Sequence, residues 1–427
     1  MQKLFGKTET RRYVVGFDLR DDFSQMSYLR EDSRSTDPVT FSMTPGKEDF
    51  NIPTALCRRT GTNQWTCGAE AVRQAQQGEG TLVTHLLNQA RDGRLVRVED
   101  ADFDPSALLA LFINRCLLML SPEIMPEQIA VVMFTGEHIN TETVQIIENV
   151  RRRLEPAAEF VCQSYADSFY DYLLLQPEGF RKKSVLLCEC EEEKPLIVRR
   201  MTYNTRTTPI VAYQEEKEYA PFGSTDPAAR DAEFTKILEE HCNQKAVIAA
   251  GYLIGSGFRG GWMKKSLAVL CRSGRVFQGN NLFSKGAAIG AMQRIVPLGI
   301  FEKYFFLSED KLKCNVGIRA LSHGEEIYHP LVDAGMLWHD VHTASDLILE
   351  NENELRLVLT PLTGEKPDSF LIRLENLPKR EGRCTRIRLS FDMTGPRRLH
   401  LLIEDLGFGE IFPSSGYKWE QNITLRQ

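Results

Sequence analysis

The sequence predicts a mixed α/β protein with two parts: an α/β core up to about residue 327 and a β-sandwich from 328 to 427. Three observations lead to this fold class. Apolar runs with the length of buried strands alternate with helical segments in the first part. A strand–turn–strand unit occurs there twice, near residues 13–28 and 184–201. From about Tyr328 the sequence changes to short alternating runs separated by turn residues, which is typical of an all-β domain.

The first strand–turn–strand unit begins with the apolar residues 13–17, turns at an acidic segment from Asp18 to Asp22, and returns over residues 24–29. Further along, Asp104-Pro105-Ser106 predicts a helix start, since aspartate caps free amides and proline is tolerated at the first helical position. The apolar residues 129–134 predict a strand buried on both faces. A turn at residues 61–63 predicts a further hairpin.

The second unit repeats the first, with strands predicted over residues 184–190 and 196–201 and an acidic turn between them. A buried strand over residues 245–253 then leads into the turn Gly255-Ser256-Gly257. Gly286 lies in a segment of small residues that predicts a helix packed at close range. We expect the strands at residues 13 and 185 to lie in two separate sheets.

The last hundred residues alternate apolar and polar side chains, as in 355–359, 370–374 and 387–391. They predict a small β-sandwich or open barrel. Phe408 and Phe412 flank a glycine-rich turn near the end of the chain. Two interpretations are open for them, a docking edge or the core of the sandwich, and the core is the more common place for such residues.

Composition limits the classes of partner. The chain of 427 residues is 42% hydrophobic and carries a net charge of -6, which argues against nucleic acid or an anionic membrane surface as a partner. The longest apolar stretch is shorter than the roughly 18 residues needed to cross a bilayer. The N-terminus lacks the apolar segment of a signal peptide, and the ten cysteines and eight histidines show no zinc spacing, so a cytoplasmic location is expected.

The order of these segments resembles the actin, Hsp70 and sugar-kinase superfamily over about residues 10 to 300. Residues 13–28 resemble the first phosphate hairpin, 185–198 the second, and 246–291 the adenosine segment. The resemblance implies a two-lobed, ribonuclease H-like core, with lobe I over about 10–165 and lobe II over about 166–327. The chain also resembles a family of uncharacterised bacterial proteins that are Hsp70-like in their N-terminal part.

Both phosphate loops depart from the superfamily pattern. Asp18 matches the acidic position of the first loop, but Arg20 replaces a glycine, and two aspartates replace the hydroxyl residues that follow. In the second loop, residues 191–193 are glutamates where the superfamily has glycines. Glycine amides are the donors that cradle phosphates, whereas carboxylates repel them. The resemblance therefore implies a core that turns over ATP poorly or not at all.

The adenosine segment keeps more of the pattern. The resemblance implies a nucleoside contact at Gly251, Gly255, Ser256, Gly257 and Gly286, with Asp18 at the acidic position near the cofactor's metal and its waters. An alternative is that these glycines only let strand and helix pack closely. The cofactor stays open: ATP or ADP with magnesium, held weakly, is one candidate. No catalytic or metal-binding residue is assigned.

Three functions follow as alternatives. The favoured one is a catalytically degenerate scaffold that binds a protein partner and holds at most a nucleoside or nucleotide without turnover. The second is an active Hsp70-like ATPase with chaperone-like peptide binding, in which the acidic loops use an unusual metal arrangement. The third is a filament subunit of the actin type. The phosphate loops separate the first two alternatives, and sedimentation tests the third.

Overall fold

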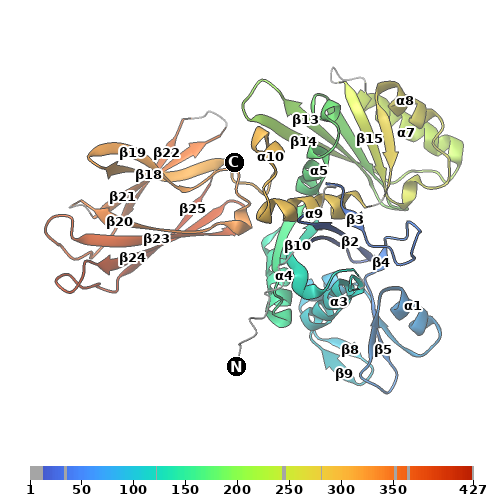
Figure 1. The fold of residues 1–427 in the computed structure, drawn as a ribbon, viewed down its shortest axis with the longest axis horizontal. Coiled ribbons are helices and arrows are strands. Elements are labelled where there is room, and N and C mark those ends of the chain that lie inside the picture. Colours follow the sequence, from blue (N-terminus) through green and yellow to red (C-terminus); the bar gives the residue numbers. More distant parts are fainter. Residues whose placement is uncertain are drawn as a thin grey trace, which may run out of the picture. The chain divides into compact units, whose positions relative to one another are not determined.

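The computed structural model describes residues 13–32, 36–121, 123–242, 247–279, 281–350, 353–362 and 366–425. The structure is mixed α/β, which confirms the predicted class (Figure 1). Two compact units divide the chain, Met1–Phe306 and Leu307–Gln427. Within the described residues, all α-helices belong to the first unit, and none of them is long and apolar enough to cross a membrane.

The first unit contains two six-stranded sheets. In the first sheet the strands lie in the order β11, β10, β1, β2, β3, with β4 also paired to β2. β1 and β2 form an antiparallel hairpin, whereas β10 runs parallel to β1, and β11 parallel to β10. The strand bounds are Tyr13–Leu19 (β1), Phe23–Arg30 (β2), Val39–Thr40 (β3), Ile52–Pro53 (β4), Ile129–Gly136 (β10) and Glu159–Ser164 (β11).

The second sheet repeats this arrangement. Its order is β16, β15, β12, β13, β14, β17, in which β12 and β13 form an antiparallel hairpin and β15 and β16 extend the sheet in parallel. The strands near residues 13 and 185 therefore lie in separate sheets, as expected. The bounds are Ser184–Glu189 (β12), Leu196–Asn204 (β13), Ile210–Tyr219 (β14), Ile248–Ile254 (β15), Arg275–Gln278 (β16) and Tyr304–Phe306 (β17).

The strand expected over residues 245–253 is β15, and residues 245 and 246 lie outside the described part of the chain. Helices pack beside each sheet. Asp104 caps one of them as predicted, because its carboxylate accepts from the amides of Ser106 and Ala107. The helix bounds are Gly68–Gln76 (α1), Leu86–Asp92 (α2), Pro105–Met119 (α3), Thr141–Leu154 (α4), Tyr165–Leu174 (α5), Glu178–Arg181 (α6), Pro227–Cys242 (α7), Lys265–Ser273 (α8), Leu282–Ile295 (α9) and Gly299–Lys303 (α10).

Helix α9 crosses α5 and the first sheet at very short range. A Cβ atom on Gly286 would lie 1.9 Å from the carbonyl oxygen of Ser168, and a Cβ atom on Gly16 would lie 2.1 Å from the carbonyl oxygen of Ser284. These distances leave no room for any side chain, so glycine is required on both sides of α9. The predicted close packing of this helix is confirmed.

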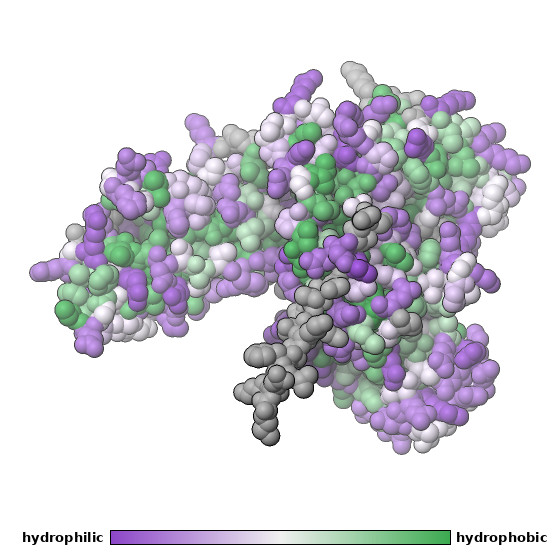
Figure 2. Space-filling view, in the orientation of Figure 1, coloured by the Kyte–Doolittle hydropathy of each residue, from purple (hydrophilic) through white to green (hydrophobic). Residues whose placement is uncertain are grey.

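Smaller strands complete the first unit. β5 pairs with both β6 and β7, and the predicted hairpin around residues 61–63 is the β5–β6 pair. The visible surface around α1 and these strands is largely hydrophilic (Figure 2). The bounds are Leu56–Arg59 (β5), Trp65–Cys67 (β6), Gly80–Val83 (β7), Val96–Val98 (β8) and Ala101–Phe103 (β9).

The second unit consists of two four-stranded antiparallel sheets, ordered β19, β18, β21, β22 and β20, β23, β24, β25. Burial alternates along β23 and β24, so one face is apolar, and the other carries ion pairs such as Asp346–Arg388 at 2.7 Å. The bounds are Cys314–Ser322 (β18), Glu325–Val332 (β19), His342–Leu349 (β20), Glu354–Pro361 (β21), Asp368–Arg373 (β22), Thr385–Gly395 (β23), Arg398–Gly407 (β24) and Lys418–Thr424 (β25).

The division between the units differs from the predicted boundary at 327. That boundary would cut β19, whereas the units separate between Phe306 and Leu307. β18 pairs with β19 and β21 and so belongs to the second unit, but its burial does not alternate regularly, and the sequence pattern missed it. The part predicted as lobe II accordingly ends at β17, which pairs with β14.

Candidate functional site

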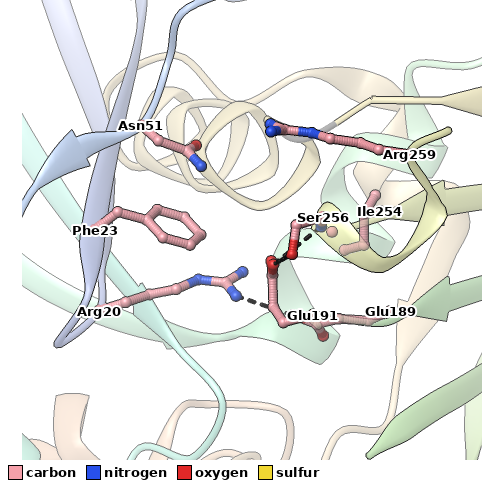
Figure 3. A pocket seen from close by; sticks show the side chains of 9 residues that line it. Arg20, Phe23, Asn51, Glu189, Glu191, Ile254, Ser256 and Arg259 are labelled. Atoms are coloured by element: carbon pink, nitrogen blue, oxygen red, sulfur yellow. Dashed lines mark hydrogen bonds and ion pairs between the residues drawn. The ribbon is translucent and has the colours of Figure 1, made fainter. Parts of the chain in front are cut away.

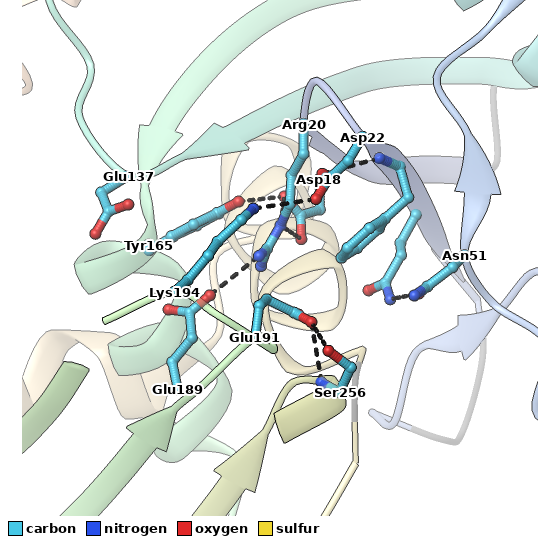
Figure 4. Close-up of polar contacts among 12 residues, drawn as sticks. Asp18, Arg20, Asp22, Asn51, Glu137, Tyr165, Glu189, Glu191, Lys194 and Ser256 are labelled. Carbon is cyan, nitrogen blue, oxygen red and sulfur yellow. Dashed lines mark hydrogen bonds and ion pairs between the residues drawn. The ribbon is translucent and has the colours of Figure 1, made fainter. Parts of the chain in front are cut away.

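The two hairpins of the first unit bring their turns together (Figure 4). Asp18 lies near the end of β1, and Glu189 ends β12. Arg20 joins them: its Nε donates to Asp18 Oδ2 at 3.1 Å, and its Nη1 donates to Glu189 Oε1 at 3.0 Å. Arg20 is therefore turned inward and links the turns of two different sheets.

Aromatic rings surround the Arg20 guanidinium. The rings of Phe23, Tyr165 and Phe283 lie 5.1, 5.0 and 5.7 Å from its central carbon, within cation–π range. Tyr165 and Phe283 stack on each other with centroids 3.9 Å apart. The guanidinium is thus enclosed by two carboxylates and three rings, which fixes its position.

Asp18 is fully buried and has a second hydrogen bond, since the Tyr165 hydroxyl donates to its Oδ1 at 2.6 Å. Burial raises the pKa of Asp18, and the charge of Arg20 opposes that rise only in part. Burial likewise raises the pKa of Tyr165 well above its ordinary value, so its hydroxyl keeps its proton and remains a donor. All the polar contacts of Asp18 are directed inward, to groups of the chain itself.

Arg199 on β13 extends the network. It is fully buried, and each of its three nitrogens reaches a different carboxylate: Nη1 to Glu189 at 2.6 Å, Nε to Glu216 at 2.7 Å and Nη2 to Glu137 at 2.9 Å. Burial tends to raise the pKa of Glu189, but the guanidiniums of Arg20 and Arg199 hold it below its ordinary value. Glu189 is therefore an ionised carboxylate shared by two arginines.

The acidic turn after β12 directs its side chains to different surroundings. Glu191 accepts hydrogen bonds from the amide and the hydroxyl of Ser256, while Glu192 and Glu193 are exposed. Lys194 reaches across to Asp22 of the first hairpin at 3.2 Å. A tight turn points its successive side chains in different directions, so the three glutamates do not share one partner. Arg20 and Glu189 line the space between the two hairpin turns.

Side chains of the two turns line a small cavity (Figure 3). The cavity there measures about 20 Å³, which is room for one water molecule at most. Side chains from both hairpins, from the residue before β4 and from the turn after β15 line it, among them Arg20, Phe23, Asn51, Glu189, Glu191 and Arg259. A cavity of this size is smaller than a triphosphate.

The predicted nucleoside-contacting glycines have packing roles in the structure. Gly251 lies in β15 against Leu270, and a Cβ atom on Gly255 would lie 2.2 Å from the carbonyl oxygen of Cys190. A Cβ atom on Gly257 would meet the sulfur of the same cysteine at 2.6 Å. Together with the contact of Gly286 already described, these distances support the close-packing alternative. Ser256 is engaged with Glu191.

An open groove of about 570 Å³ lies beside Gly255. Its walls come from β3 and the loop that follows, the turn after β15, the end of β16 and the start of α9. The lining is mainly polar, with Thr40, Glu48, Phe50, Arg259, Gln278, Asn281 and Lys285. A hydrogen bond of 2.7 Å from Asn281 to Thr40 ties two of the walls together.

Sequence reasoning missed most of the residues that hold the two hairpins together. Arg199 follows the apolar residues 196–198 in the second hairpin, and a charge inside an apolar strand is a signal of a buried ion pair that could have been used. Glu137 and Glu216 carried no local signal. In the described part of the chain, no group of three or more His, Cys, Asp or Glu side chains is arranged to hold a metal ion.

Comparison with known proteins agrees with the division of the chain. Residues 311–425 match a domain of unknown function, DUF8552. Residues 37–309 match the model described as the C-terminal part of a family of unknown function, DUF5716, and the two matches meet near the division between the units. None of the curated proteins compared with the chain matches it. Since the first match covers more than half of the chain, the protein belongs to the DUF5716 family.

Proposed function

We propose that the first unit is a catalytically degenerate core of the actin/Hsp70 type, and that the protein is a scaffold that binds a protein partner without ATP turnover. The repeated topology supports the fold: each sheet combines an antiparallel hairpin with two parallel strands in the same order. We also propose that the two antiparallel sheets of the second unit form a β-sandwich, in agreement with the alternating burial of β23 and β24.

One observation carries the functional proposal: the Arg20 guanidinium, bound to Asp18 and Glu189, fills the space between the two hairpins. In a phosphate site, backbone amides point at the ligand. Here the donors are guanidinium groups, and carboxylates of the chain already accept from them. A triphosphate would have to displace these contacts and lie against carboxylates, each costing on the order of 1 kcal/mol even at water-like screening.

The ATPase alternative has less support. It requires the acidic loops to hold magnesium, and the carboxylates of these loops pair instead with Arg20, Arg199, Lys194 and Ser256. The space between the hairpins does not limit a nucleoside without phosphates in the same way. The groove beside Gly255 has a volume within the usual range of ligand sites. We therefore include a nucleoside, held without turnover, as a second candidate ligand of the scaffold.

Calorimetry with magnesium ATP and with adenosine tests the proposal. We expect neither measurable ATP binding nor magnesium-dependent turnover for the wild type. Arg20→Gly combined with Glu191→Gly restores two small residues in the loops and should give measurable ATP affinity, whereas Arg97→Gly, which removes an exposed ion pair with Asp102, should not. Micromolar ATP binding with multiple turnovers by the wild type would refute the scaffold and favour the ATPase.

A further inference from the structure

The loop between β24 and β25 exposes large apolar side chains. Ile411 is 84% exposed, Phe408 44% and Tyr417 46%. The loop is nevertheless ordered, because Phe408 and Phe412 form an isolated bridge in which the Phe408 amide donates to the Phe412 carbonyl at 2.6 Å. Residues 409–411 thus form the tip of a closed turn. The interpretation of Phe408 as sandwich core is wrong, since its side chain is exposed.

A buried carboxylate holds the base of this loop. Arg380 donates to both oxygens of Asp405 at 2.8 and 2.7 Å, and both side chains are almost completely buried. The amides of Gly407 and Ser415 donate to the same carboxylate at 3.0 and 2.8 Å. Arg380 also donates to the carbonyl of Pro413 at 3.0 Å. One ion pair therefore fixes the segments on both sides of the tip.

The backbone of the loop depends on glycine. Gly407 has a φ of +65°, and a Cβ atom there would lie 2.4 Å from the carbonyl oxygen of Phe412. Gly409 has a φ of +71°, in the left-handed region that favours glycine. Close approach and hydrogen bonding together preorganise the loop, and preorganisation lowers the entropy cost of binding.

The charges near the tip indicate which kind of surface it fits. Glu410 is the only ionisable side chain between Asp405 and Lys418, apart from the phenol of Tyr417. It is exposed and makes no ion pair with the described residues. Residues 307–427 contain nineteen acidic and fifteen basic side chains, which disfavours an anionic membrane. Exposed apolar side chains with a polar or charged rim are typical of a protein interaction site, and a charge at the rim fixes the orientation of the partner.

We propose that the turn from Phe408 to Phe412 inserts into an apolar pocket of a partner protein, with a lysine or arginine at the rim of that pocket facing Glu410. This inference rests on the scaffold function and names its docking element. Ile411 and Phe408 supply the buried area, and Glu410 fixes the orientation. The Asp405–Arg380 pair positions the turn and does not itself touch the partner.

Site-specific photo-crosslinking in the full-length protein, expressed in its native cells, tests the inference. p-Benzoylphenylalanine replaces Ile411, and, as a matched control in the same unit, Ile348 on β20, which is 53% exposed. We expect one discrete adduct at position 411, which is weak or absent at 348. Glu410→Lys should reduce that adduct about tenfold, the loss expected for one charge contact. The crosslinked peptide should contain apolar residues next to a lysine or arginine.

Two further variants make the result decisive. Replacing the mapped basic residue of the partner with glutamate should restore the adduct of the Glu410→Lys variant. A loss of adduct caused by a structural change in the turn would not be restored in this way. Gly407→Ala keeps the exposed side chains but displaces the turn, and should weaken the adduct. Unchanged thermal unfolding of Glu410→Lys serves as the folding control.

Several results would overturn the inference: no adduct at 411, equal adducts at 411 and 348, an adduct insensitive to Glu410→Lys, or an adduct with lipid or with a second copy of this chain. The scaffold function fails by a separate measurement, namely ATP turnover by the wild type. A protein without turnover and without an adduct at 411 would therefore refute only the docking element.

Discussion

Replacing Arg199 with methionine is the strongest test of the ion network between the two hairpins. Methionine keeps an apolar stem of similar length and removes the charge. The three carboxylates that the guanidinium binds would then lose a partner each: Glu189, Glu137 and Glu216. Glu137 and Glu216 are partly exposed and can turn toward water, whereas Glu189 is buried and would keep only Arg20.

The expected loss of stability follows from the burial of Glu189. Removing one partner of a buried ion pair costs about 3–5 kcal/mol, because the other charge is left without compensation. Since Arg20 still compensates part of the Glu189 charge, we expect a loss near the lower end, about 3 kcal/mol. For the first unit, Met1–Phe306, that loss corresponds to a decrease in Tm of about 5 °C.

Thermal and urea unfolding measure the loss. Glu189→Gln in the Arg199→Met background removes the uncompensated charge, so the double variant should be less destabilised than the sum of the two single variants. Arg97→Met is the control, because its ion pair with Asp102 is exposed and should contribute less than about 1 kcal/mol. Two results would show that the buried network does not hold the hairpins together. In the first, Arg199→Met lowers the free energy of unfolding no more than Arg97→Met does. In the second, the effects of Arg199→Met and Glu189→Gln simply add in the double variant.

Three other predictions concern separate parts of the structure. Because the pKa of Glu189 is lowered in the folded protein, its contribution to stability is present above the unfolded pKa and is lost as pH falls through the folded pKa. Glu189→Gln should therefore flatten the acid side of the stability curve, measured by urea unfolding from neutral pH down into the acid range. Gly286→Ala should lower the free energy of unfolding by about 1–3 kcal/mol, because its Cβ atom would overlap the carbonyl of Ser168; an unchanged urea midpoint would contradict the close crossing of α5 and α9. Arg380→Met should lower the free energy of unfolding by about 3 kcal/mol, because it leaves Asp405 buried without its ion-pair partner. Protease should then cleave the β24–β25 loop faster than in the wild type. Equal cleavage would mean that the ion pair does not order the loop.

Local signals account for the parts of the fold that the sequence predicted. The apolar residues 13–17 and 129–134 identified β1 and β10, and Asp104 identified the start of α3, because each signal lies within one element. β18 was missed because no such signal lies within it. Its membership of the second unit depends on pairing with β19 and β21, and its own pattern does not alternate.

The site was predicted less completely than the fold. The sequence placed Asp18 and the turn after residue 189 at the ends of two equivalent strands, and the structure brings these turns together. It did not show which turn residues face inward, because that depends on backbone angles such as the φ of +63° at Glu193. Arg199 meets carboxylates 10, 17 and 62 residues away, and no local pattern indicates contacts at such separations.

The ion network also bears on how a scaffold of this kind would behave. In a nucleotide-binding core, the ligand supplies the anion that the two hairpins share, so the distance between the hairpins depends on ligand concentration. Here the carboxyl groups of Asp18 and Glu189 are the acceptors, and Arg20 and Arg199 are the donors, so both halves of the interaction belong to the chain. Their effective concentration is fixed by the fold and does not vary with metabolite levels. If the proposed core is correct, its hairpins therefore stay together in the absence of ATP, and a partner that recognises this state would bind a surface that nucleotide does not regulate.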